Sequence, residues 1–139
     1  MARDDEQLLR TSSFRVLIDG RELGFAEITQ LTSLTTPEPG GERRHGFDTV
    51  VLRRALTRST ELYDWRRRIA GGAHDRRTVT IQQLSTPGGD IANSWRLDGA
   101  WPRRWSGPAF NAQGSDVAME ELELAFDDLV WLGEHEQGG

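Results

Sequence analysis

The side chains that most often do chemistry are few and scattered in this sequence. Three histidines, His45, His74 and His135, stand in separate loop-like contexts, and none belongs to an HxxxH, HxH or carboxylate-linked pattern. The sequence has no cysteine, and all 17 of its basic residues are arginine. Thiolate ligands, cysteine nucleophiles, a P-loop lysine and a Schiff-base lysine are therefore excluded. We expect no metal site, no cofactor and no catalytic centre.

The segment MEELELAF, residues 119–126, contains a candidate carboxylate pair. On a strand, Glu121 and Glu123 share one face, and two carboxylates on one face are what acid–base hydrolysis of a glycoside requires. A solvated strand face explains the same pattern more simply, and we favour it. An enzyme with a carboxylate site remains the most distant alternative.

Trp101 and Trp105, with two arginines between them, suggest an aromatic platform for a sugar ring or a base. The other interpretation is core packing at a strand bend, because Pro102 suits an edge or a bulge and Gly107-Pro108 ends the element. We favour packing. A small carbohydrate-binding module is kept as the alternative function from another class.

Composition indicates one globular domain. The 139 residues are 36% hydrophobic and 28% charged, and no apolar run approaches the length of a membrane span. The net charge of -5 argues against a dedicated nucleic-acid binder. The polar, acidic start MARDDEQLLR does not resemble a signal peptide, so we expect assembly in the cytoplasm and no membrane partner.

Alternating apolar residues predict most of the chain to be strands. FRVLID reads as a strand that ends in the Asp19-Gly20 turn, and we expect a long partner strand over residues 24–35. Further strands are expected at 47–56 and in a hairpin of 76–84 with 90–101, in which Val79 and Ile81 face Trp95 and Leu97. Residues 118–130 contain strong helix formers, but their longer alternation favours one strand.

Residues 59–72 predict the single helix. Ser59 is the expected N-cap, Leu62, Trp65 and Ile69 fall on one face, and Gly71-Gly72 ends the element. An ion pair between Asp64 and Arg68 is expected within it.

The proline- and glycine-rich segment 35–46 predicts a long surface loop. Unstructured loops of this length inside compact domains often bind a partner, so this loop is a candidate contact site. The domain is expected at 13–132, with an N-terminal arm at 1–12 and a polar tail at 133–139. The candidate contact residues are Thr36, Pro37, Glu38, Arg43, Arg44 and Phe47.

The expected fold class is α+β, mainly β, with two packed sheets or a partly open barrel and one flanking helix. Such a fold leaves sheet edges unpaired, and these edges can pair between neighbouring copies.

Three blocks in this order resemble the tail tube proteins of contractile phages and the inner-tube proteins of related contractile injection systems. They are FRVLIDGRELGFAEITQL, STELYDW and AWPRRWSGPAFNAQGSDVAMEELELAF, and the resemblance extends from Phe14 to Leu129. Phe110 replaces a usual leucine, and Gln30-Leu31-Thr32 replaces a usual Ser-Gly-Leu. The motif positions expected to be structural are Trp65, Trp101, Pro102, Trp105, Gly107, Pro108, Asn111, Glu121 and Glu123.

The resemblance implies a tail-tube/Hcp-like fold of two roughly orthogonal, barrel-like sheets. It implies hexameric rings that stack into a hollow tube, with the sheath and baseplate of the same particle as partners and cargo or DNA in the lumen. The particle would be a virion or an injection particle. No reaction is implied. The departures from the motifs leave a tube-initiating or baseplate-adjacent paralogue as an alternative.

Overall fold

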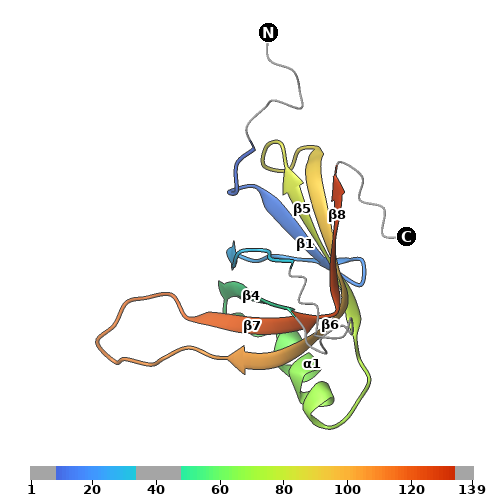
Figure 1. Cartoon of the computed structure of the whole chain (residues 1–139). Coiled ribbons are helices and arrows are strands. Elements are labelled where there is room, and N and C mark those ends of the chain that lie inside the picture. The colour runs from blue at the N-terminus through green and yellow to red at the C-terminus, as the bar shows by residue number, and fades with distance from the viewer. Residues whose placement is uncertain (1–8, 34–47, 134–139) are drawn as a thin grey trace, which may run out of the picture.

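The computed structural model describes residues 9–33 and 48–133 (Figure 1). Most of the predicted N-terminal arm, the predicted contact loop and nearly all of the C-terminal tail lie outside the described residues. The elements in chain order are β1 (Phe14–Ile18), β2 (Arg21–Leu23), β3 (Glu27–Ile28), β4 (Asp48–Ala55), α1 (Glu61–Ala70), β5 (Arg77–Leu84), β6 (Ile91–Ser106), β7 (Met119–Phe126) and β8 (Asp128–Gly133).

The strands form two antiparallel sheets that share one strand. Sheet A has the order β2-β1-β5-β6-β8, and sheet B has the order β3-β4-β7 followed by the second part of β6. The sheets cross each other, and α1 lies beside sheet B (Figure 1). This arrangement confirms the expected mainly β fold with one helix, although the sheets do not close into a barrel.

The core is built from the alternate residues that face inward from both sheets. Val16 and Ile18 of β1 meet Leu52 of β4 and Leu124 of β7 in one buried cluster. In the hairpin of β5 and β6, Val79 lies opposite Leu97 and Ile81 lies opposite Trp95, as predicted. The period of two in each strand therefore places one set of apolar side chains in the interior.

Two segments of the chain pass from one sheet to the other at the same point: β6, and the run from β7 to β8. The residues of β6 up to Asp98 pair with β8, whereas those from Trp101 onward pair with β7. Gly99 lies between them with a φ of 64°, a conformation that favours glycine. Across from it, the Asp127 backbone N–H donates to the Asp98 carbonyl at 2.9 Å. The crossing of the two sheets is thus fixed by Gly99 and Asp127.

This crossing corrects two of the predicted strands. The segment 118–130 is strand rather than helix, but Asp127 divides it into β7 and β8, which belong to different sheets. The strand predicted to end at Trp101 continues to Ser106 because it crosses into sheet B. The bend lies at Gly99, while Pro102 borders a bulge on the edge of sheet B.

The long strand predicted over residues 24–35 is wrong in the part that is described. Only Glu27 and Ile28 form a strand, paired with Arg53 and Leu52. The Thr29 side-chain Oγ1 accepts a hydrogen bond from the Val51 backbone N–H at 2.9 Å. A side chain there takes the place of a backbone acceptor, so the ladder ends.

Helix α1 begins one residue later than predicted. Thr60 is the N-cap residue, and its hydroxyl donates to Asp64 Oδ2 at 2.8 Å. Arg68 does not pair with Asp64 as predicted; its Nε contacts Asp75 Oδ2 at 2.9 Å. Leu62 and Trp65 are buried and Gly71 is the C-cap residue, as predicted.

Asp75 fastens the end of the helix to β5. Its backbone carbonyl accepts from Trp65 Nε1 at 2.7 Å, and its carboxylate accepts from Arg77 and Arg68. The Arg77 guanidinium also lies 4.4 Å from the centre of the Trp65 ring. The hydrogen bond from Arg77, and after it the one from Arg68, holds the pKa of Asp75 below its usual value, and partial burial opposes the shift only in part.

We expect this shift to appear in the pH dependence of folding. A lowered carboxylate pKa contributes stability that is complete above the unfolded-state pKa of 3.8 and is lost as the pH falls through the folded-state value. In Asp75→Asn, urea unfolding should therefore show a shallower loss of stability below about pH 4 than the unmodified protein. Asp116→Asn, on an exposed loop, is the matched control; an equal slope in Asp75→Asn and the unmodified protein would contradict the assignment.

Gly99→Ala should destabilise the subunit by about 1–2 kcal/mol, because an added side chain is strained at positive φ. The new Cβ would also lie 2.3 Å from Asp127 Oδ2. Gly24→Ala is the control, since nothing lies within 4 Å of its Cβ and its φ is not positive. Thermal unfolding compares the two variants, and equal midpoints would show that the crossing does not depend on Gly99.

Candidate assembly interface

The two carboxylates of the predicted pair lie on the outer face of sheet B and contact arginines. Glu121 Oε2 lies 3.5 Å from Arg53 Nε, and Glu123 Oε1 accepts from Arg104 Nε at 2.9 Å. Arg103 approaches the same Glu123 at 3.6 Å. Both glutamates are thus half-buried members of a charged strand face.

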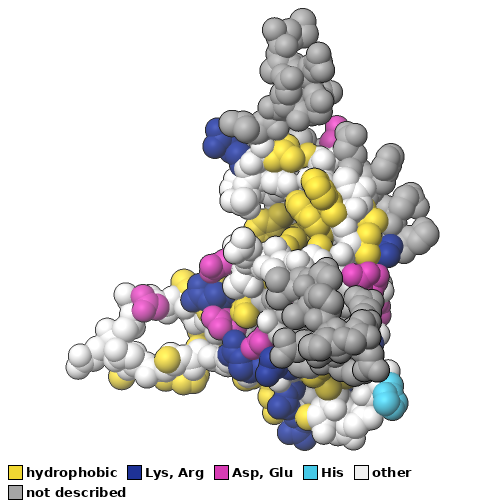
Figure 2. All heavy atoms as spheres, viewed as in Figure 1, with side chains coloured by type: hydrophobic (Ala, Val, Ile, Leu, Met, Phe, Trp, Pro, Cys, Tyr) yellow, Lys and Arg dark blue, Asp and Glu magenta, His cyan; other side chains and the backbone are white. Residues whose placement is uncertain are grey.

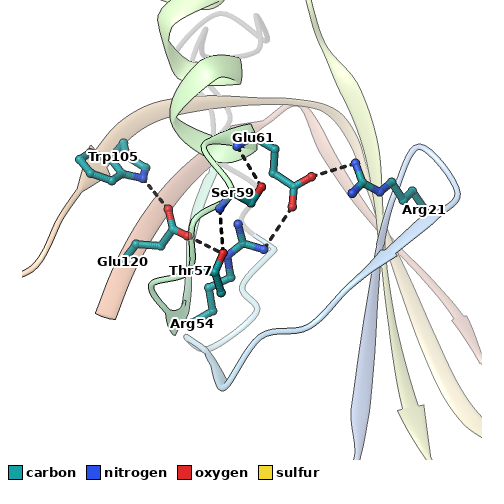
Figure 3. Close-up of polar contacts among 7 residues, drawn as sticks. All are labelled: Arg21, Arg54, Thr57, Ser59, Glu61, Trp105 and Glu120. Carbon is teal, nitrogen blue, oxygen red and sulfur yellow. Dashed lines mark hydrogen bonds and ion pairs between the residues drawn. The ribbon is translucent and has the colours of Figure 1, made fainter. Parts of the chain in front are cut away.

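The neighbouring Glu120 faces the opposite way and is buried, with 2% of its surface exposed. Its carboxylate accepts from Arg54 Nε at 2.8 Å and from Trp105 Nε1 at 2.7 Å (Figure 3). Arg54 extends the network to Glu61 of α1 at 3.4 Å, and Arg21 of β2 contacts the same Glu61 at 2.8 Å (Figure 3). One chain of charges therefore links both sheets to the helix.

Sequence reasoning missed this network, although a signal was present. Glu120 has the same parity as Leu122 and Leu124, and Arg54 has the same parity as Leu52. Two charges of opposite sign on the buried faces of two strands predict an internal ion pair. In the structure β4 and β7 are paired, and Arg54 lies directly opposite Glu120.

The tryptophans pack against the protein. Trp105 contacts the core cluster, and its ring meets Tyr63 edge-to-face at 5.1 Å. Since its indole N–H is donated to Glu120, the polar group that a sugar platform would use is already bonded. Trp101 is half-buried, with the Arg76 guanidinium 5.9 Å from its ring centre. These contacts favour packing over the exposed platform.

Residues 107–118 form a loop that extends away from the two sheets, here termed the projecting loop (Figure 1). Gly107 starts it, and a Cβ there would lie 2.9 Å from the Trp105 ring. At its tip the Asn111 carbonyl accepts from the Gly114 N–H at 2.9 Å. Phe110 is 88% exposed and Val117 is 72% exposed, so the loop presents apolar side chains to the outside.

The six predicted contact residues from Thr36 to Phe47 lie outside the described residues. Within the described ranges, no group of three or more histidine, cysteine, aspartate or glutamate side chains is placed to hold a metal ion. No helix found in those ranges has the length and apolar character needed to cross a membrane.

Solved structures share this fold. A chain of the PVC sheath–tube complex, an extracellular contractile injection system in its extended state, aligns with a TM-score of 0.77 and 19% identity, over 94% of this chain and 95% of that one. A chain of the anti-feeding prophage baseplate aligns with 0.69 and 21%, over 91% and 97%. Hcp1 from Flavobacterium johnsoniae aligns with 0.62 and 12%, over 90% and 99%. No match was found among curated protein sequences.

The open pair of crossed sheets with one flanking helix is the fold that this chain shares with those solved structures. A family model described as T4-like virus tail tube protein gp19 matches residues 10–130. The chain belongs to the T4-like virus tail tube protein family and is a structural subunit of an inner tube.

Glu120→Ala should destabilise the subunit by about 3 kcal/mol or more, because it leaves the Arg54 guanidinium buried without its main partner. Glu121→Ala is the matched control one residue away on the exposed face, and it should cost less than about 1 kcal/mol. Urea unfolding of both variants measures the difference. If the two substitutions cost the same, the buried pair does not have the role assigned to it.

Proposed function

We propose that this subunit forms hexameric rings that stack into a hollow tube inside a contractile sheath, and that cargo or DNA passes through the lumen. The observation that carries the proposal is the family match over residues 10–130. The subunit acts without catalysis, assembles in the cytoplasm and becomes part of an injection particle or a virion. Its partners are further copies of itself and the sheath and baseplate of the same particle.

The sheet edges support assembly from identical copies. Each sheet has one very short edge strand, β2 or β3. The opposite edges are β8 and the second part of β6, and nothing in the described ranges pairs with their outer sides. The second part of β6 carries Pro102 and a bulge, which weaken an edge. β8 has no proline, and its one irregularity lies at its end, between Trp131 and Gly133. Unpaired backbone groups of this kind bind another strand, so β8 is the better edge for a neighbouring copy.

The segments flanking the described core complete the proposed contacts. We assign the N-terminal arm, residues 1–12, and the loop with Thr36, Pro37 and Glu38 to contacts between subunits or rings. Arg43, Arg44 and Phe47 belong to the same loop. The domain itself extends over 13–132, and the tail over 133–139.

The fold comparison also supports a second position for this subunit, at an end of the tube. A chain of the PVC sheath/tube terminator aligns with a TM-score of 0.72 and 18% identity, close to the value for the sheath–tube complex. The fold therefore suits both the body of a tube and its ends. We favour the body, and a tube-initiating or baseplate-adjacent position is the alternative.

Concentrated purified protein should form rings or hollow rods visible by negative-stain electron microscopy. A tube subunit assembles because head-to-tail contacts between rings do not close and so propagate. Monodisperse monomers at all concentrations, together with binding to a panel of glycans, would support the carbohydrate-binding alternative. Rings that do not stack into rods would instead favour a position at the end of the tube.

Deleting residues 38–44 should leave a folded subunit that no longer stacks into rods. The loop is assigned to contacts and the core elements lie elsewhere in the chain, so the circular dichroism spectrum and the unfolding midpoint should stay close to those of the full chain. Electron microscopy of the variant measures stacking. Rods of normal length would remove this loop from the contacts.

A further inference from the structure

An apolar groove opens between the two sheets on one side of the molecule. It has a volume of about 400 Å³, and its apolar lining consists of Phe14, Ala26, Ile28, Leu31, Ile81 and Trp95. These residues come from β1, β5 and β6 of sheet A and from the segment around β3 of sheet B. Hydrophobic side chains gather on this face over sheet A (Figure 2).

The apolar surface continues beyond the groove. The Trp131 ring of β8 stacks on Trp95 with their centres 6.3 Å apart and their planes 13° from parallel, and Trp131 is 67% exposed. The crossing of the sheets is the cause, because sheet B covers only part of the inner face of sheet A. A contiguous exposed apolar surface of this kind marks an interaction site more often than a scatter of single apolar residues does.

The same chain carries an apolar projection that its own body does not cover. Phe110 is the most exposed large hydrophobic side chain of the described residues, and Val117 follows it on the other arm of the projecting loop. Neither residue is part of the groove lining. The loop extends away from the sheets (Figure 1). Among the described residues of a single molecule, its apolar side chains are therefore exposed and do not fill the groove.

We propose that the projecting loop of one copy inserts Phe110 into the apolar groove of a second copy. Burying an aromatic side chain and the groove that receives it removes both apolar surfaces from water. The contact joins two different surfaces of the same chain, so it repeats from copy to copy and produces a ring or a filament rather than a closed pair. The inference rests on the proposed function, and it identifies which surfaces meet.

Charge supports this occupant. Asp116 is the single charged residue of the projecting loop. Gln83 lines the groove, and its side-chain amide donates to the backbone carbonyl of Arg10. Arg10 is exposed, so a basic residue lies beside the opening of the groove. Glu27, the acidic residue of the lining, already contacts Arg53 at 3.7 Å. In the proposed contact, the loop of one copy carries a negative charge and the groove rim of the second copy carries a positive one. Opposite charges favour the association of these two surfaces.

A disulfide cross-link tests the contact directly, because the chain has no cysteine of its own. In the double variant Ala26→Cys and Ala109→Cys, which keeps Phe110, mild oxidation should link successive copies into a ladder on a denaturing gel. Both positions are exposed, so the subunit should remain folded. The control pairs Ala109→Cys with Ala70→Cys, an alanine that is also exposed and lies at the end of α1, and should give no ladder.

The outcomes separate this contact from the proposed function. A ladder with the Ala26 pair and none with the Ala70 pair supports the contact. Rings or rods without a ladder would overturn the contact and leave the tube function standing. Monomers that give neither assemblies nor a ladder would overturn both.

Single substitutions provide a second measurement. Phe110→Ser should lower the affinity between copies at least about tenfold, as expected for the loss of a buried aromatic anchor. Ala26→Asp should act in the same direction by placing a charge in the apolar groove. Gln113→Ser, in the same loop, is the control, and analytical ultracentrifugation measures all three. Self-association of Phe110→Ser equal to that of the control would contradict the proposal.

Discussion

The structure depends on one constraint: β6 belongs to both sheets, and it can change sheets only where its backbone turns at Gly99. Gly99 has a positive φ, and the Asp127 backbone N–H donates to the Asp98 carbonyl. Together they hold β6 and the junction of β7 and β8 at a single crossing. The angle at which the sheets meet, the partial cover of sheet A and the open groove all follow from that crossing. The direction in which β6 leaves toward the projecting loop follows from it as well.

The interior combines apolar packing with one buried set of charges. Arg54 and Glu120 lie opposite each other on paired strands. Glu120 accepts from Trp105 within sheet B, and Arg54 contacts Glu61 of the helix. An internal ion pair adds little net stability compared with apolar residues of equal size, but leaving one charge unpaired is costly. The network therefore specifies one arrangement of the helix and sheets more than it strengthens the fold.

Much of the fold could be predicted from the sequence, because alternation and helix-ending glycines are local signals. The hairpin of β5 and β6, the helix around Trp65 and the strand character of residues 119–126 were all accessible in this way. The exchange between sheets was not, since a period of two is the same whichever sheet a strand joins. Glu120 was missed because three nearby glutamates look like one solvated face, although parity places Glu120 with Leu122. The contact loop could be predicted only as a candidate, and it lies outside the described residues.

The unbroken passage of β6 through both sheets has a mechanical consequence. A force applied to one sheet reaches the other along a covalent backbone, without relying on side-chain contacts between the layers. Because β6 is hydrogen-bonded in both layers, we expect the two sheets to unfold together as a single cooperative unit.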